Sequence, residues 1–224
     1  MQQPRPYNCV TQSLDAFLAQ LVRYVASGHY FYVTGHVPGR KSPEEVDRKL
    51  ILLYGLGKPK WERARRRLGE QAGIHYLRHG KFFVLIATHG RHQFFEDHQK
   101  NICDIRRTAL KVRGYSIRYT FSDQDQRWKV FVRLDKPTYQ SVRAHLLDLA
   151  RRPSYRDTAR LIAEVESLPF QGYAPVRGQV LAIIKAMNRV RRHAGVGPLP
   201  MDIVPRMRPV RRVFVTADEE QQAA

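Results

Sequence analysis

Cysteine is scarce in this chain of 224 residues, which contains only Cys9 and Cys103. Two cysteines cannot form the disulfide framework of small secreted domains, so the sequence favours a reducing, cytoplasmic compartment. No apolar run approaches the roughly 18 residues that a membrane-spanning helix needs. The opening Met-Gln-Gln-Pro-Arg-Pro also lacks the apolar stretch of a signal peptide. We therefore expect a protein without a membrane partner.

Acidic residues are the second shortage, because 20 Asp and Glu face 39 Lys and Arg, which gives a formal charge of +19. The excess is mostly arginine, with 29 Arg against 10 Lys. A guanidinium group offers a planar fork that fits a phosphate with two hydrogen bonds, which lysine cannot do. The composition therefore predicts a nucleic-acid partner, RNA or DNA. The alternative is that arginine is simply frequent in the proteome from which the chain comes.

Hydrophobic residues make up 43% of the chain, enough for a buried core. Apolar periodicity predicts an N-terminal helix over 12–27 and a strand over 29–37. Ser42, Pro43 and Glu45 predict the start of a second helix, because serine caps, proline fits the first turn and Glu45 can close a capping box. Further elements are expected along the chain: a basic helix over 59–68, a hairpin of 74–78 with 81–88, a helix over 93–108, and a second hairpin of 116–121 with 128–134.

From residue 136 onward the pattern is purely helical, with helices expected at 137–151, 155–167 and 174–194. The order of the preceding elements is the split βαβ order of ferredoxin-like domains. We therefore predict an α+β fold: a ferredoxin-like sheet with an extra hairpin strand, an N-terminal helix and a C-terminal three-helix region. The expected segments are an N-terminal helix at 1–28, the α+β domain at 29–135, a helical domain at 136–197 and a basic, proline-containing tail at 198–224.

Two strand segments resemble the signature motifs of RNA-recognition-motif domains. Phe31-Tyr32-Val33-Thr34-Gly35-His36 is similar to the first-strand motif, and Gly80-Lys81-Phe82-Phe83-Val84 matches the third-strand motif at Gly80, Phe83 and Val84. Lys81 stands where that family usually has an aromatic residue, and Phe82 where it has a small one. The resemblance covers about a quarter of the chain. It implies that Tyr32 and Phe83 stack on bases and that Lys81 contacts a phosphate.

Packing offers another interpretation of the same aromatic residues. Strand side chains alternate between the two faces of a sheet, so an aromatic face edged with cations would suit a single strand. The C-terminal helices must also bury their apolar faces, and the open face of the sheet is the nearest large surface. Tyr32 and Phe83 are therefore either base-stacking residues or core residues.

Cations gather in several clusters that could hold phosphates. In the basic helix expected over 59–68, the cationic side chains repel one another unless phosphates or solvent relieve the repulsion. Cations at a helix C-terminus also offset the helix dipole, so that part of the charge has a structural explanation. The candidate phosphate-binding residues are Lys58, Lys60, Arg63, Arg65, Arg66 and Arg67 of the basic helix, Arg189, Arg191 and Arg192 at a helix end, and Arg206, Arg208, Arg211 and Arg212 of the tail.

The second expected hairpin offers a further contact surface. Period-two alternation places Lys129, Phe131 and Arg133 on one face of its second strand. An aromatic side chain between two cations can contact both a base and its phosphates. We add Arg118, on the first strand of this hairpin, to the candidate nucleic-acid-binding residues.

Signals for catalysis are weak. His89, His92 and His98 are the best candidate metal ligands, but their spacing matches no zinc pattern, so we expect neither a metal nor a cofactor. The topology resembles that of HUH endonucleases, which nick single-stranded DNA and hold a metal with two histidines separated by one apolar residue. The chain reads Ile86-Ala87-Thr88-His89-Gly90-Arg91-His92 instead. Tyr139 and Tyr155 are the available candidate nucleophiles.

Three functions follow from these patterns. The first is a non-enzymatic protein that binds RNA or single-stranded DNA. The second is a nickase or transposase of a mobile element or replication system, related to the HUH enzymes. The third is an assembly protein whose basic arms dock on a larger nucleoprotein complex. The sequence favours the first.

Overall fold

The computed structural model describes residues 7–58, 62, 69–152, 158–204, 206 and 212–215. It is an α+β structure, as expected, and its internal contacts divide the chain into two units. The first unit comprises Met1–Ala109, Tyr119–Val130 and Val210–Ala224, and the second comprises Leu110–Arg118 and Phe131–Pro209.

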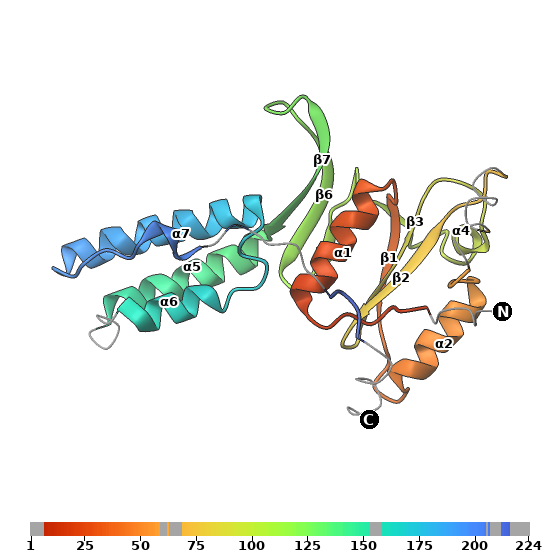
Figure 1. The fold of residues 1–224 in the computed structure, drawn as a ribbon, viewed down its shortest axis with the longest axis horizontal. Coiled ribbons are helices and arrows are strands. Elements are labelled where there is room, and N and C mark those ends of the chain that lie inside the picture. Colours follow the sequence, from red (N-terminus) through yellow and green to blue (C-terminus); the bar gives the residue numbers. More distant parts are fainter. Residues whose placement is uncertain are drawn as a thin grey trace. The chain divides into compact units, whose positions relative to one another are not determined.

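A four-stranded sheet forms the centre of the first unit (Figure 1). Each pair of neighbouring strands in this sheet is antiparallel. The turn between β2 and β3 contains Gly80 at φ 58°, a conformation that glycine adopts without steric cost. The strands are β1 (Phe31–His36), β2 (Ile74–His79), β3 (Phe82–Ala87) and β4 (Cys103–Asp104), in the order β2-β3-β1-β4.

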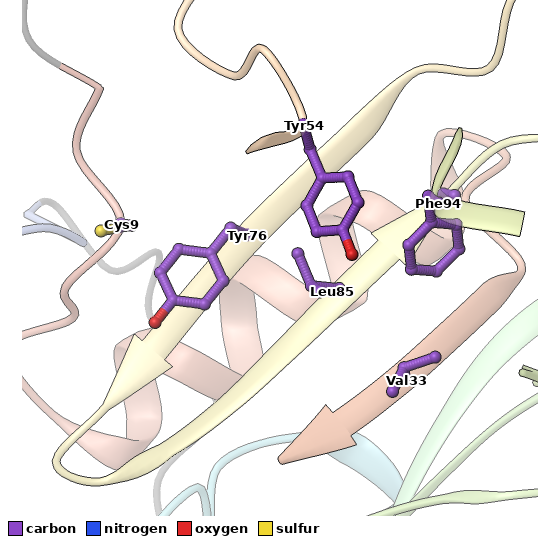
Figure 2. Close-up of a cluster of buried hydrophobic side chains, with 7 residues drawn as sticks. Cys9, Val33, Tyr54, Tyr76, Leu85 and Phe94 are labelled. Atoms are coloured by element: carbon purple, nitrogen blue, oxygen red, sulfur yellow. The ribbon is translucent and has the colours of Figure 1, made fainter. Parts of the chain in front are cut away.

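Helices cover both faces of this sheet. On one face α1 (Leu14–Ala26) places Phe17 against Phe82, with ring centroids 5.9 Å apart. On the other face α2 (Pro43–Leu53) and α4 (Gln93–Asp97) close a core that contains Tyr54 and Phe94 (Figure 2). Local signals place these helices, since Ser13 caps α1 and Ser42 caps α2.

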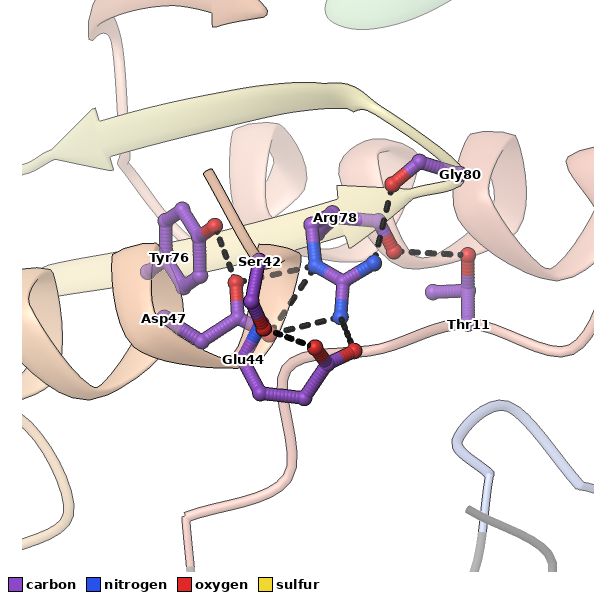
Figure 3. A network of polar contacts seen from close by, with 7 residues as sticks. All are labelled: Thr11, Ser42, Glu44, Asp47, Tyr76, Arg78 and Gly80. Carbon is purple, nitrogen blue, oxygen red and sulfur yellow. Dashed lines mark hydrogen bonds and ion pairs between the residues drawn. The ribbon is translucent and has the colours of Figure 1, made fainter. Parts of the chain in front are cut away.

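A buried ion pair lies beneath α2. Both Asp47 and Arg78 are buried, and Arg78 donates from Nε to both carboxylate oxygens at 2.9 Å and from a terminal nitrogen at 2.7 Å (Figure 3). The hydroxyl of Tyr76 donates to the same carboxylate at 2.5 Å. Burial, followed by this hydrogen bond, raises the pKa of Tyr76 far above its ordinary value, so the phenol stays protonated.

The prediction of a helix over 93–108 is correct only for its first five residues. Helix α4 ends at Asp97, and Cys103 and Asp104 instead pair with Tyr32 and Phe31 as β4. The backbone nitrogen of Ile105 also donates to the Tyr30 carbonyl at 2.9 Å. The edge of β1 presents unpaired backbone groups, and this segment satisfies them where a longer helix would not.

The second expected hairpin does form, but the expectation that it extends the first sheet is wrong. It belongs to a separate three-stranded sheet in the order β5-β6-β7. Arg113 at φ 40° and Gly114 at φ 85° reverse the chain ahead of it. Its strands are β5 (Leu110–Val112), β6 (Tyr115–Ser122) and β7 (Arg127–Leu134).

Three helices occupy the second unit, as the sequence predicts. They bury apolar stripes that include Leu146, Leu161 and Ile183. The side-chain amide of Gln179 accepts from the backbone nitrogen of Leu134 at 2.8 Å and donates to its carbonyl at 3.1 Å, which fixes the end of β7. The elements are α5 (Lys136–Arg151), α6 (Thr158–Glu166), α7 (Ala174–His193) and the short 3-10 helix η2 (Met201–Ile203).

The C-terminal segment of the first unit pairs with the N-terminal one. The backbone nitrogen of Gln12 donates to the Val213 carbonyl at 3.2 Å, and that of Val215 donates to the Val10 carbonyl at 3.0 Å. Val10 itself forms a parallel bridge with Arg78 of β2. Both ends of the described chain therefore extend the same edge of the sheet. Within the described residues, no helix is both long and apolar enough to cross a membrane.

Candidate nucleic-acid interface

Three aromatic rings form a stacked row in the first unit. Tyr30 stacks on Tyr119 with ring centroids 4.9 Å apart, and Tyr119 stacks on Trp128 at 5.4 Å. The interplanar angles are 24° and 26°, so the rings are close to parallel. Phe121 meets Trp128 edge-on at 6.1 Å. Trp128 is 53% exposed and Phe121 43% exposed, so this end of the row is open to solvent.

Backbone hydrogen bonds align the row. Ile105 donates to the Tyr30 carbonyl, and Tyr119 in turn donates to the Ile105 carbonyl at 3.5 Å. Along β6, alternate side chains share a face, and their exposure rises from 0% at Ile117 to 43% at Phe121. The face of the strand that is buried at one end is thus presented to solvent at the hairpin tip.

A guanidinium group covers the other end of the row. The Cζ atom of Arg106 lies 4.8 Å from the ring centroid of Tyr30 and 5.7 Å from that of Phe31, within the range of a cation–π interaction. Asp104 fixes this group through hydrogen bonds of 3.0 and 3.1 Å from Nε and 2.7 Å from a terminal nitrogen. Asp104 therefore holds the Arg106 guanidinium close to both aromatic rings.

Electrostatics keep both members of this pair charged. Burial alone would raise the pKa of Asp104, but the hydrogen bonds from Arg106 outweigh burial and hold that pKa below its ordinary value. The same hydrogen bonds raise the pKa of Arg106. Burial, followed by a hydrogen bond with Tyr119, raises the pKa of Tyr30 to about 12. At neutral pH the Tyr30 phenol is therefore neutral and lies beside a permanent cation.

A cavity of about 450 Å³ adjoins the pair. Its volume lies within the range of small-molecule sites. Aromatic, acidic and cationic side chains meet here, a combination that suits a flat polar ligand. The lining includes Phe31, Ile102, Asp104, Arg106, Arg107 and Thr108.

Of the two residues that the RNA-recognition-motif resemblance marks for stacking, one lies in the core and the other, Phe83, is half-buried against it. Tyr32 is buried and its hydroxyl donates to the Thr108 carbonyl at 3.2 Å, while the Phe83 ring covers Gly35. Tyr32 is paired with Ile86 and Phe83 with Gly35, so alternation places the two aromatic side chains on opposite faces of the sheet. They do not share a platform. Lys81 is exposed in the turn that follows Gly80.

Most of the predicted basic helix lies outside the described residues, namely Lys60, Arg63, Arg65, Arg66 and Arg67. Lys58 is described, and its Nζ atom lies 2.5 Å from Oε1 of Glu62. In the tail, Arg206 and Arg212 are exposed, whereas Arg208 and Arg211 also lie outside the described residues.

The predicted cationic face of β7 is divided between the two units. In the first, Lys129 pairs with Asp125 at 2.5 Å. In the second, Arg133 is exposed and its Cζ atom lies 5.9 Å from the ring of the half-buried Phe131. Arg118 of β6 is exposed as well.

The cations at the end of α7 fall into two kinds. Arg189 and Arg192 are exposed and accessible to a phosphate. Arg191 is only 1% exposed, and its Nε atom donates to the Gly197 carbonyl at 2.7 Å. Burial lowers the pKa of Arg191. Its prediction as a phosphate contact is therefore wrong, because the side chain instead fixes the loop that follows the helix.

The candidate metal and catalytic residues occupy separate settings. His92 caps α4 by accepting from the Phe94 nitrogen at 3.1 Å, and Nε2 of His98 lies 2.9 Å from the Tyr54 hydroxyl. His89 is exposed. Among the described residues, no three His, Cys, Asp or Glu side chains are arranged to hold a metal ion. Tyr139 is half-buried on α5, and Tyr155 lies outside the described residues.

Sequence reasoning missed the stacked row and its cation. Tyr30 and Tyr119 belong to segments far apart in the chain, so no local spacing joins them. A signal did exist in the hairpin, where Tyr119 and Phe121 alternate with polar residues on a strand that ends in a turn. No protein-family model matches this chain, and no curated protein matches it either.

Proposed function

We propose that this protein binds single-stranded nucleic acid without chemically altering it. The observation that carries the proposal is the row Tyr30–Tyr119–Trp128, which is open at Trp128 and covered by Arg106 at Tyr30. Every base has a flat π face, and each base stacked on an aromatic side chain contributes about 1–3 kcal/mol. An exposed tryptophan at the end of a stacked row offers the next position to a base.

The geometry favours a single strand over a duplex. Bases in a duplex are already stacked on their neighbours, whereas an unpaired strand can offer their faces to the protein. A phosphate of that strand would meet Arg106, which lies beside the row over Tyr30. The formal charge of +19 supplies long-range attraction toward any polyanion.

The first unit supports a ferredoxin-like arrangement as part of this proposal. Its strand order β2-β3-β1-β4 and antiparallel pairs accompany a split βαβ connection, with α2 between β1 and β2 and α4 between β3 and β4. In RNA-recognition-motif domains the bases stack on the two central strands. Here both faces of those strands are covered, and the proposed platform lies beside the sheet.

Tryptophan fluorescence tests the proposal directly. The chain has two tryptophans, so Trp61→Phe leaves Trp128 as the sole emitter. We expect an oligodeoxythymidine strand to quench this emission, and a duplex of the same length to quench it less. In fluorescence anisotropy with labelled strand, Trp128→Ala should weaken binding roughly tenfold through loss of one stacked base.

Leu52→Ala is the matched control, because Leu52 is an exposed apolar residue on α2 in the same unit. It should bind like the unaltered protein. Unquenched emission at saturating strand, or equal affinity of the Trp128→Ala and Leu52→Ala variants, would contradict the proposal.

A further inference from the structure

The cavity beside Arg106 has a composition that the stacked row alone does not explain. A carboxylate repels phosphates, yet Asp104 lines this cavity within a strongly basic chain. Its side chain is 16% exposed, and its oxygens accept from the side chain and backbone nitrogen of Arg106. Asp104 therefore lines this cavity with hydrogen-bond acceptors, which suit a ligand that donates rather than a phosphate, which only accepts.

The cavity adjoins the row through one residue. Arg106 lies over both Tyr30 and Phe31, and Phe31 belongs to the lining of the cavity. A strand with one base stacked on Trp128 that continues past the row thus reaches the cavity at the opposite end. The Phe31 ring and Ile102 supply apolar contact, while Arg107 supplies donors and Asp104 supplies acceptors.

We infer that this cavity binds one guanine base of the bound strand. Guanine presents two acceptors, N7 and O6, on one edge, and arginine is their commonest specific partner. It also presents two adjacent donors, N1–H and the N2 amino group, which a carboxylate can accept together. Adenine, cytosine and thymine each lack the pair of adjacent donors that a carboxylate can accept together. The side chains of Arg107 and Asp104 match both edges of guanine.

The occupied site requires a change of partner for Asp104. When a base enters, Arg106 turns toward the phosphate of that nucleotide, and the carboxylate exchanges guanidinium donors for base donors. Arg106 is the more exposed member of the pair, with a side chain 41% exposed against 16% for Asp104, so it is the one that solvent can receive.

This inference rests on the proposed function, and one titration series separates the two. The probe is an oligodeoxythymidine strand that carries a single central dG, compared with the same strand carrying dA. In the Trp61→Phe protein, we expect the dG strand to bind about tenfold more tightly than the dA strand. The affinity of the plain thymidine strand measures binding to the stacked row without the contribution of a guanine.

Two substitutions test the residues. Asp104→Asn and Arg107→Gln should each bring the dG strand to the affinity of the dA strand, while thymidine binding changes by less than about threefold. Arg107 is exposed, so its replacement keeps the test valid if Asp104→Asn disturbs folding. Arg48→Gln, an equal change of charge on the exposed side of α2, is the control and should keep the preference for dG.

The outcomes are distinguishable. Equal affinity for dG and dA with intact thymidine binding overturns the guanine site and leaves the stacking proposal standing. Failure of every strand to bind overturns the stacking proposal itself. Free guanosine monophosphate serves as the last competitor. If the free nucleotide displaced the dG strand at concentrations near the dissociation constant of that strand, the cavity would be a mononucleotide site. The inference would then be wrong.

Discussion

At the scale of single residues, the buried ion pair shows why the first unit tolerates a charge in its core. Asp47 lies on the buried side of α2, and Arg78 on β2 reaches it from the sheet. Burial alone would lower the pKa of Arg78, but the bonds to Asp47 outweigh it and raise that pKa. The carbonyl of Gly80 accepts a further hydrogen bond from the same guanidinium at 2.9 Å. The pair thus fixes α2 against the turn of the β2–β3 hairpin.

Breaking this pair should be far more harmful than replacing it. Asp47→Ala leaves Arg78 buried without its carboxylate and should lower the free energy of unfolding by about 3–5 kcal/mol. A double variant, Asp47→Leu with Arg78→Met, should recover most of that loss, because two apolar side chains carry no desolvation penalty. Urea denaturation followed by circular dichroism measures both. Arg48→Ala, on the exposed side of α2, is the control and should change the free energy by less than about 0.5 kcal/mol. Additive losses in the double variant would contradict this account.

At the scale of elements, local patterns predict most helices and the strands that form hairpins. Helix α1 combines a serine cap with an apolar stripe, and β2 and β3 meet across a two-residue turn, so short segments carry the whole signal. The short strand β4 has no such pattern. It forms only because β1, far away in sequence, offers an unpaired edge. Ile102 and Ile105 imitate a helical stripe, which explains the expectation of a longer helix.

The difference between local patterns and contacts of remote segments also explains how much of the site could be predicted. Charge density identifies a nucleic-acid partner as a hypothesis, and alternation identifies the hairpin. The contacts of Tyr30 with Tyr119, and of Arg106 with Tyr30, depend on backbone pairing between remote segments. Whether Tyr32 and Phe83 face solvent depends on which helices cover the sheet, and strand alternation alone cannot decide that.

The end of α7 offers a prediction at this scale. Arg191→Gln removes a buried hydrogen bond to Gly197 and should lower the free energy of unfolding by about 1.5–3 kcal/mol. Its affinity for a thymidine strand, measured by anisotropy below the unfolding transition, should stay within about twofold of the original, since a loss of this size leaves the protein folded. Arg192→Gln is the control, because its exposed side chain contributes less than about 1 kcal/mol through the helix dipole. If Arg191→Gln weakened binding strongly without loss of stability, its structural role would be wrong.

At the scale of the whole molecule, the excess of positive charge determines how binding responds to salt. Each phosphate neutralised on a single strand contributes about −0.7 to the slope of log affinity against log salt, so about six contacts give roughly −4. We expect a slope of that order for a thymidine strand, measured by anisotropy from low to physiological salt. Arg106→Gln should make the slope shallower by about 0.7, because it removes one phosphate contact. Arg48→Gln should leave it unchanged, and a flat dependence in the original protein would exclude phosphate contacts as the source of affinity.

Residues 213–215 complete the sheet edge beside residues 10–12, and this has a consequence for biosynthesis. In a chain that emerges from the ribosome in order, the whole second unit is released before residues 213–215 of the first unit are available. Until then Val10 and Gln12 have backbone groups without their final partners. The helical unit therefore has time to fold first, and the first unit closes only when residue 215 has been released.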